Sequence, residues 1–426
     1  MIRSTNTLRL AAVASAGALV LAACGGGDGD GGDGGDSGQA KSKADGTLTI
    51  GALLPQTGSL AYLGPPEFAG VDLAIEDINK AGGVLGKDVK GVKADSGDTD
   101  TGIAPSETDK LLKGGSDVIV GAASSGVSMT VIDKILAAGV VQFSPANTST
   151  DFDLKKYAEP DLYFRTAPSD ILQGAVLANL LIEDGHKNVA ILARQDAYGE
   201  TLAAEAKKGL EGAGSKVATT VFYGEKAQSY DSQVSEVADS KPDAIILVAF
   251  DETVSIVPKL IEANVGPSDV PTYFVDGNTA NYGKGDTKTL KDGTLEGVKG
   301  TIPGAEAKGD FKERLATVDP NLKDFAYAGE SYDAVVVSAL AAVAADSDAG
   351  TAIAEEIINV TKGGEKCSEF KECADLLADG QDIDYDGVSG PIEMGDTGSP
   401  TSASIGIYEY DGKNKIAPIK YISGQI

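Results

Sequence analysis

Short apolar runs alternate with helical patterns along the chain from Thr47 onward. The apolar run Leu48–Leu54 has the length and the flanking residues of a strand, and a polar, turn-rich stretch follows it. After Pro66, apolar residues recur close to helical spacing until Ala81-Gly82-Gly83, a sequence typical of a helix end. This pattern predicts a strand over residues 48–54 and a helix that begins at Pro66.

The same unit of a strand followed by a helix recurs along the chain. Further strands are predicted over residues 117–120, 140–143, 189–193, 216–222, 244–249 and 405–410. Further helices are predicted around residues 131–136, over 199–210, up to 263 and over 331–345. Repeated units of this kind imply parallel sheets that helices cover on both faces. Because the pattern restarts after Arg165, we expect two such α/β lobes.

The loops that follow strands are the candidate binding segments, because open parallel sheets bind ligands beyond the carboxyl ends of their strands. These loops comprise residues 55–64, 121–128, 144–149, 194–198 and 274–278.

The N-terminus resembles a bacterial lipoprotein signal. Arg3 and Arg9 precede an apolar, small-residue run over residues 10–23, which is too short to span a bilayer comfortably. The run ends in Leu21-Ala22-Ala23-Cys24, which resembles the lipobox, whose cysteine is lipidated and becomes the first mature residue. We expect residues 1–23 to be a signal peptide and Cys24 to carry lipid. The alternative is an ordinary signal peptide with an incidental cysteine.

The residues after Cys24 are expected to form a tether. Residues 24–45 are rich in Gly and Asp, and such a chain is flexible and extended, as a membrane tether requires. With Cys24 assigned to lipid, Cys367 and Cys373 remain as a pair, for which a disulfide is the default in an oxidising compartment. The chain has one His, which argues against a zinc site, and we assign no metal.

Charge and missing motifs exclude several function classes. Lys and Arg number 36 against 64 Asp and Glu, a formal charge of -28, which argues against nucleic-acid binding. The sequence contains no Gly-x-x-x-x-Gly-Lys-Ser/Thr loop for ATP and no Gly-x-Ser-x-Gly nucleophile elbow. With a single His and no paired metal ligands, we expect neither an enzyme nor a cofactor.

Several of these stretches together resemble the branched-chain amino-acid (Leu/Ile/Val)-binding proteins of ABC transporters, in lipoprotein form. The stretches are Thr57-Gly58, Gly64, Glu67-Phe68, Ala81-Gly82-Gly83, Gly121 to Ser125, Ser144 to Thr148, Asp196 to Gly199 and Tyr332-Asp333-Ala334. The resemblance runs from about Thr47 to the C-terminus. It implies the type I periplasmic-binding-protein fold, in which two doubly wound parallel-sheet lobes are joined by three crossovers.

The resemblance also implies where the chain passes between the lobes. The crossings are expected near Phe164-Arg165-Thr166, Val298 to Thr301 and Asp386 to Ile392. The N-terminal lobe then comprises residues 46–165 and 300–388, and the C-terminal lobe residues 166–299 and 389–426.

The positions that match the family's site come from both lobes. Ser125 lies where a strand gives way to a helix, so its hydroxyl and N–H can meet a carboxylate. Thr148 and the Ala146 carbonyl lie in a second such loop, and the matching family positions bind carboxylate and ammonium. Asp276 matches an acid that binds the ammonium, which needs a charged partner once it is desolvated. Family members carry the longer Glu at the position of Asp276.

Other matching positions line the cleft. Tyr198 and Tyr327 match cleft aromatics, whereas Leu63 stands where an aromatic is often found, which suggests a roomier apolar pocket. Ala123 and Ser124 line the same wall. Simpler roles remain open for the polar site residues. Ser125 and Thr148 are also suited to helix capping, Tyr198 to packing at the cleft rim, and Asp276 to a turn before Gly277.

The expected function is that of an extracytoplasmic solute-binding protein that closes two lobes around a small amino-acid-like ligand. The resemblance implies a monomer that is anchored to the bacterial cell membrane by its lipid and presents the ligand to an ABC permease with a separate ATPase. The alternatives are an amide- or urea-binding protein of the same class, or a receptor subunit that signals ligand binding.

Overall fold

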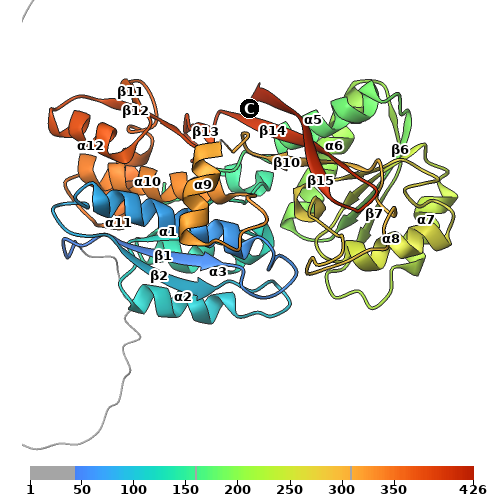
Figure 1. Ribbon diagram of the computed structural model, residues 1–426, viewed down its shortest axis with the longest axis horizontal. Helices are drawn as coiled ribbons and strands as arrows, with labels where there is room; N and C mark the ends of the chain where they lie inside the picture. The colour runs from blue at the N-terminus through green and yellow to red at the C-terminus, as the bar shows by residue number, and fades with distance from the viewer. Residues whose placement is uncertain (1–43, 159–160, 308) are drawn as a thin grey trace, which may run out of the picture. The chain divides into compact units, whose positions relative to one another are not determined.

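The computed structural model describes residues 44–158, 161–307 and 309–426 (Figure 1). The predicted signal peptide, Cys24 and nearly all of the predicted tether lie outside the described residues. None of the helices in the described ranges is long and apolar enough to cross a membrane.

The first lobe is built on a five-stranded parallel sheet with the strand order β2-β1-β3-β4-β5. Its strands are β1 (Thr49–Leu54), β2 (Lys90–Asp95), β3 (Val118–Gly121), β4 (Val141–Ser144) and β5 (Tyr163–Arg165). Strands β1, β3 and β4 are buried along their whole length, as expected for a sheet that is covered on both faces.

Helices cover both faces of this sheet. The helices α1 (Gly64–Lys80), α10 (Ala328–Ala344) and α11 (Gly350–Ile357) pack together on one face, and α2 (Ala104–Lys113) and α3 (Ser125–Ala137) on the other (Figure 1). Two prolines in the first turn favour the start of α1. The N–H groups of a helix's first turn have no acceptor within the helix, so a proline there loses no hydrogen bond. Helix α10 is buried on nearly every side, which explains its mainly apolar sequence.

Several shorter elements complete the first lobe. They are the 3-10 helix η1 (Thr150–Asp153), α4 (Lys155–Ala158), α9 (Gly309–Val318), α12 (Phe370–Ala378), β11 (Glu365–Cys367), β12 (Ile383–Gly387) and β13 (Gly390–Pro391). Two of them, α12 and β12, contact α10. The predicted disulfide is confirmed: Cys367 at the end of β11 is bonded to Cys373 in α12.

The second lobe contains a seven-stranded sheet with the strand order β15-β14-β10-β9-β8-β6-β7. Five strands are parallel: β6 (Asn188–Arg194), β7 (Lys216–Tyr223), β8 (Ala244–Val248), β9 (Thr272–Phe274) and β10 (Lys299–Pro303). The two C-terminal strands, β14 (Ser402–Tyr410) and β15 (Ile416–Gln425), are antiparallel and extend one edge of the sheet. The strand predicted over residues 405–410 lies within β14, which runs antiparallel to β10.

Helices also cover both faces of the second sheet. The helices α5 (Asp170–Glu183) and α6 (Ala197–Gly212) lie on one face, and α7 (Asp231–Asp239) and α8 (Thr253–Glu262) on the other (Figure 1). The 3-10 helix η2 (Asp276–Asn278) follows directly after β9. It therefore brings Asp276 to the carboxyl end of the sheet, where the parallel strands end.

The first crossing is fixed by a fully buried arginine. Arg165 donates from Nε to Ser399 Oγ at 2.8 Å and from a terminal nitrogen to Asp153 Oδ1 at 2.6 Å. It also donates to the backbone oxygens of Asn147 and Ser149, at 3.2 and 2.9 Å. A buried guanidinium requires several acceptors, and here they join the first crossing to the chain before β14.

Two predicted lobe boundaries fall within or before paired strands. Residue 300 lies inside β10, which pairs with β9 and β14, so the second crossing comes after Pro303. Strand β13 pairs with β12 of the first lobe, within the stretch from Asp386 to Ile392 where the third crossing is expected. The exact division of the chain between the two lobes stays a prediction.

Candidate ligand-binding site

A small cavity lies where the strand ends of both lobes meet. Its volume is about 20 Å³, room for roughly one water molecule. The lining residues are Leu60, Leu63, Ala123, Ser124, Ser125, Ala146, Tyr198, Phe250, Asp276, Gly277 and Tyr327. All the predicted ligand-binding residues except Thr148 are among them, so the structure brings together side chains that are up to 264 positions apart in the sequence, from Leu63 to Tyr327.

The first-lobe wall of the cavity is the N-terminus of α3. Ser124 is the N-cap of this helix, and its side chain accepts a hydrogen bond from the Val127 N–H at 3.4 Å. The capping role considered for Ser125 therefore belongs to its neighbour. Ser125 is the first helical residue, and its Oγ accepts from the Ser149 N–H at 3.4 Å. The first N–H groups of a helix lack partners within it and attract anions, so this wall suits a carboxylate.

The second loop of the first lobe is held against the first by Asn147. Its Nδ2 donates to the backbone oxygens of Ala122 and Ala123, at 3.1 and 2.9 Å. Thr148, one position later, is fully buried and does not line the cavity. Its backbone oxygen accepts from the Asp170 N–H at 2.7 Å, and its side chain lies beside the Asp170 carboxyl. A direct ligand contact from Thr148 stays a prediction.

Asp276 is the acid on the second-lobe side. Its Oδ1 accepts from the Tyr198 hydroxyl at 2.6 Å and from Gln173 Nε2 at 2.9 Å, and its Oδ2 accepts from the Tyr327 hydroxyl at 2.6 Å. The carboxyl is buried, with 8% of the residue exposed, and burial raises its pKa although these three hydrogen bonds act in the opposite direction. Within the described ranges, no Lys or Arg pairs with Asp276.

Tyr327 reaches Asp276 from an unusual backbone conformation. It immediately precedes α10 and has φ 58° and ψ 8°, in the left-handed region that non-glycine residues rarely adopt. That conformation costs about 1 kcal/mol, which surrounding contacts must offset. The 2.6 Å hydrogen bond to Asp276 is one such contact. Strain of this kind at a buried polar cluster is typical of functional sites.

Sequence reasoning missed two polar residues of α5 beside this carboxylate. Gln173 donates to both Asp276 Oδ1 and Thr301 Oγ1, the latter at 3.1 Å. Asp170 accepts from Thr201 Oγ1 at 2.7 Å through Oδ2, and burial raises its pKa to about 7. The Gln173 Oε1 atom has no partner in the described part of the chain. The one feature of the sequence that could have pointed to Asp170 and Gln173 is their position in the first turns of α5, the helix that follows the first crossing.

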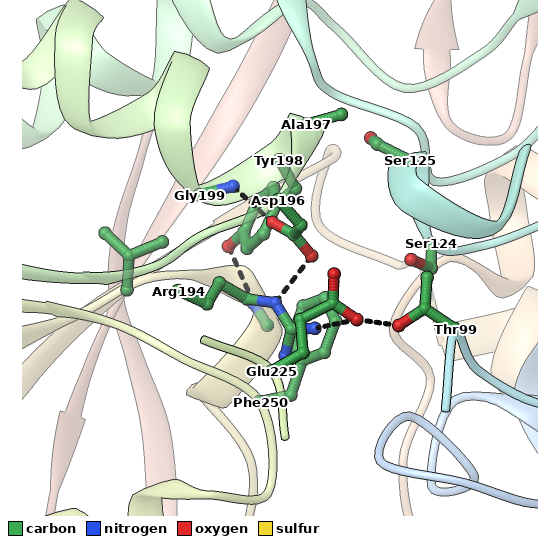
Figure 2. Close-up of polar contacts among 12 residues, drawn as sticks. Thr99, Ser124, Ser125, Arg194, Asp196, Ala197, Tyr198, Gly199, Glu225 and Phe250 are labelled. Atoms are coloured by element: carbon green, nitrogen blue, oxygen red, sulfur yellow. Dashed lines mark hydrogen bonds and ion pairs between the residues drawn. The ribbon is translucent and has the colours of Figure 1, made fainter. Parts of the chain in front are cut away.

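An aromatic stack positions Tyr198 (Figure 2). The rings of Tyr198 and Phe250 are stacked with centroids 5.4 Å apart, and the Arg194 guanidinium lies 3.6 Å from the centre of the Phe250 ring. Asp196 caps α6 by accepting from the Gly199 N–H at 2.8 Å and also binds Arg194 Nε at 2.6 Å. The cap and the stack together fix the ring that faces the cavity.

The two lobes also touch beside this stack. The Thr99 hydroxyl of the first lobe donates to the Glu225 carboxyl of the second, which also lies near Arg194 (Figure 2). Burial raises the pKa of Glu225 to about 7. Nearby, Lys226 Nζ lies 3.6 Å from Asp100 Oδ1. These contacts between lobes exist only while the lobes are together.

The described residues contain no group of three or more His, Cys, Asp or Glu side chains that could hold a metal ion. The acid at the end of β2, Asp95, instead stabilises the turns beside it. Asp95 accepts from the backbone N–H groups of Gln56 and Gly97, at 2.9 and 2.8 Å, and from the Thr57 hydroxyl at 2.7 Å.

The fold agrees with comparisons to known proteins. A family described as periplasmic binding protein matches residues 47–415. The chain belongs to this periplasmic binding protein family. The family consists of binding proteins rather than enzymes, which confirms that expectation.

Two curated relatives and one solved structure illustrate the similarity. The chain is 36% identical over 191 residues to the leucine-, isoleucine-, valine-, threonine- and alanine-binding protein of Pseudomonas aeruginosa, over 45% of this chain and 50% of that one. It is 27% identical over 382 residues to the Leu/Ile/Val-binding protein BraC3 of Rhizobium johnstonii, over 88% of this chain and 94% of that one. The match to the first relative thus spans half of its length.

The solved structure is that of a leucine binding protein, LivK, from Thermotoga maritima. It is similar with a TM-score of 0.68 and 19% identity, over 88% of this chain and 98% of that one. This likeness concerns the fold, and it confirms the type I periplasmic-binding-protein fold with two α/β lobes.

Proposed function

We propose that this protein is an extracytoplasmic solute-binding lipoprotein of an ABC importer and captures a small amino-acid-like ligand between its lobes. One observation carries the proposal. A buried carboxylate without a cationic partner in the described chain, Asp276, and the N-terminus of α3 line the same cavity. An α-amino acid offers one group for each, because its ammonium requires an acid and its carboxylate requires N–H donors.

The cavity lining also suits the apolar side chain of such an amino acid. Leu60, Leu63, Ala123 and Phe250 provide apolar surface between the two polar ends. Aliphatic side chains are stabilised there by about 25 cal/mol for each Å² removed from water. The names of the two curated relatives, which are binding proteins for leucine, isoleucine and valine, support a branched-chain or related amino acid.

Binding requires the lobes to move. The cavity of about 20 Å³ is far smaller than the roughly 300–1,000 Å³ of typical small-ligand pockets, so the ligand enters when the lobes separate. The ligand then docks on α3, and Tyr198 and Asp276 close over it from the second lobe. Only contacts that are made in the closed form favour closure. In this proposal, the contact between Asp276 and the ligand has that role. The closed protein presents both lobes to the permease.

Calorimetry on matched variants tests the assignment of Asp276. Two ligands are compared: leucine, and the neutral amide that has leucine's carbon skeleton but lacks the α-amino group. Each is titrated into wild type, Asp276→Asn and Asp269→Asn. Asp269 is an exposed residue of the same lobe and serves as the control. We expect Asp276→Asn to weaken leucine by at least about 30-fold, since losing one partner of a buried charge pair costs about 2–5 kcal/mol. The amide and the control should change little. Equal losses for leucine and the amide contradict the assignment.

Membrane attachment is tested separately through Cys24. The full-length chain and Cys24→Ser are expressed in a bacterium that processes lipoproteins, and membrane and soluble fractions are compared. We expect wild type in the membrane fraction and Cys24→Ser in the soluble fraction, because a thiol is needed for the lipid. Retention of Cys24→Ser in the membrane contradicts the lipid anchor.

A further inference from the structure

One residue contacts the Asp276 carboxylate from outside the cavity. Gln173 is fully buried in α5 and is not among the residues that line the cavity. Its Nε2 donates to Asp276 Oδ1 at 2.9 Å and to Thr301 Oγ1 at 3.1 Å. An ionised carboxylate only accepts hydrogen bonds, so the nitrogen of the Gln173 amide, rather than its oxygen, has to face it. Asp276 is therefore the route by which Gln173 can act on a ligand.

The backbone around Asp276 is fixed by Asn278. Its Oδ1 accepts from the Val275 N–H at 2.9 Å, and its Nδ2 donates to the backbone oxygen of Leu247, in β8, at 3.1 Å. These two hydrogen bonds hold η2 against the sheet but do not touch the Asp276 carboxylate. The direction of that carboxylate is left to its own hydrogen-bond donors, since the side chain can still turn about its two single bonds.

The side-chain donors divide between the two carboxylate oxygens. Oδ1 accepts from Gln173 and from the Tyr198 hydroxyl, which belong to α5 and α6 of the second lobe. Oδ2 accepts from the hydroxyl of Tyr327, which immediately precedes α10 of the first lobe. When the lobes separate, Tyr327 leaves with the first lobe, whereas Gln173 and Tyr198 stay with Asp276. Oδ2 is then the oxygen that an incoming ammonium can reach.

We infer that Gln173 is a positioning residue for ligand binding: its amide holds Oδ1 of Asp276 so that Oδ2 faces the α-ammonium of the ligand. The inference rests on the proposed function, which assigns the ammonium to Asp276. Thr301 supports the arrangement, because its hydroxyl in β10 accepts a hydrogen bond from the same amide nitrogen. The acid of the site is thus tied through one side chain to both α5 and β10. Recognition of a charged amine then depends on a glutamine that does not touch the ligand.

Calorimetry on a double-mutant cycle tests this role. Leucine is titrated into wild type, Gln173→Met, Asp276→Asn and the double variant, since methionine keeps the length of glutamine without its donors. We expect Gln173→Met to weaken leucine about 10-fold, equivalent to about 1.4 kcal/mol, which is the size of a hydrogen bond to a charged group. In the Asp276→Asn background it should add little, because no carboxylate is left to hold.

Two controls separate positioning from a general loss of structure. The neutral amide with leucine's carbon skeleton should bind Gln173→Met and wild type alike. Gln425→Met, a change at an exposed glutamine of the same lobe, should leave both ligands unchanged. Should Gln173→Met fail to fold, as judged by urea unfolding, Thr301→Val takes its place, since it removes only the second acceptor of the amide. We expect Thr301→Val to weaken leucine several-fold and not the amide, and unchanged leucine binding overturns the inference.

The outcomes also distinguish this inference from the proposed function. Leucine binding that falls with Asp276→Asn but not with Gln173→Met refutes the positioning role and leaves the proposed function standing. Equal losses for leucine and the amide, or fully additive losses in the double variant, make Gln173 a structural residue only and overturn the inference. Absence of leucine binding to wild type refutes the proposed function itself.

Discussion

Replacing Glu330 by glutamine is expected to stabilise the protein at neutral and alkaline pH. Glu330 lies in the first turn of α10 and is 5% exposed. Its neighbour Glu67 is fully buried, and both Glu67 carboxyl oxygens lack a partner in the described part of the chain. Burial raises the pKa of Glu330 to about 8. Ionising this side chain in the folded protein is therefore unfavourable.

The sign and size of the effect follow from the pKa shift. Between the ordinary value of 4.5 and about 8, the folded chain holds a proton at Glu330 that the unfolded chain has released. The free energy of unfolding therefore falls as pH rises through this window. A shift from 4.5 to about 8 corresponds to on the order of 5 kcal/mol at most, at about 1.36 kcal/mol per pKa unit. Glutamine has no proton to lose, so its variant escapes this loss.

Urea unfolding at pH 5, 7 and 8.5 measures the difference. We expect Glu330→Gln to match wild type within about 1 kcal/mol at pH 5 and to exceed it by several kcal/mol at pH 8.5. Asp170, whose pKa burial also raises, contributes equally to both proteins and cancels. Glu313→Gln, an exposed change in α9, is the control. Stability curves for Glu330→Gln and wild type that stay parallel across this range refute the reasoning.

Two further predictions concern stability and closure. Replacing Cys367 and Cys373 by serine should lower the free energy of unfolding by about 2 kcal/mol in the chain-entropy model. The value is small because the disulfide closes a short loop, with a sequence separation of 6. An unchanged urea midpoint contradicts this prediction. Thr99→Val should weaken ligand affinity several-fold without changing the urea midpoint, since its hydroxyl donates to Glu225 across the lobes; unchanged calorimetric affinity shows that this contact does not stabilise the closed form.

Much of the fold follows from the apolar pattern. Strand β1 was predicted over residues 48–54 and observed at Thr49–Leu54, because a short apolar run between turns has few other stable arrangements. The antiparallel hairpin of β14 and β15 was not foreseen as such, since a strand's sequence does not state its partner's direction. The end of β10 at Pro303 depends on pairing with distant strands, which local sequence does not specify.

The site divides in a similar way. Ser125, Tyr198 and Asp276 could be selected because strand ends meet at one edge of a sheet and because they match family positions. The burial of Thr148 could not be foreseen, because it depends on how its loop packs against α5. Gln173 was missed since its role arises from a hydrogen bond between residues 103 positions apart. Tertiary contacts of this kind leave no local pattern.

The most direct test of the account is a crystal structure of the protein grown with a bound α-amino acid. We expect the α-carboxylate within hydrogen-bond distance of the Ser125 N–H or hydroxyl and the α-ammonium within about 3 Å of the Asp276 carboxylate, with the lobes closed over both. A ligand held elsewhere, or one whose ammonium makes no contact with Asp276, contradicts the central claim.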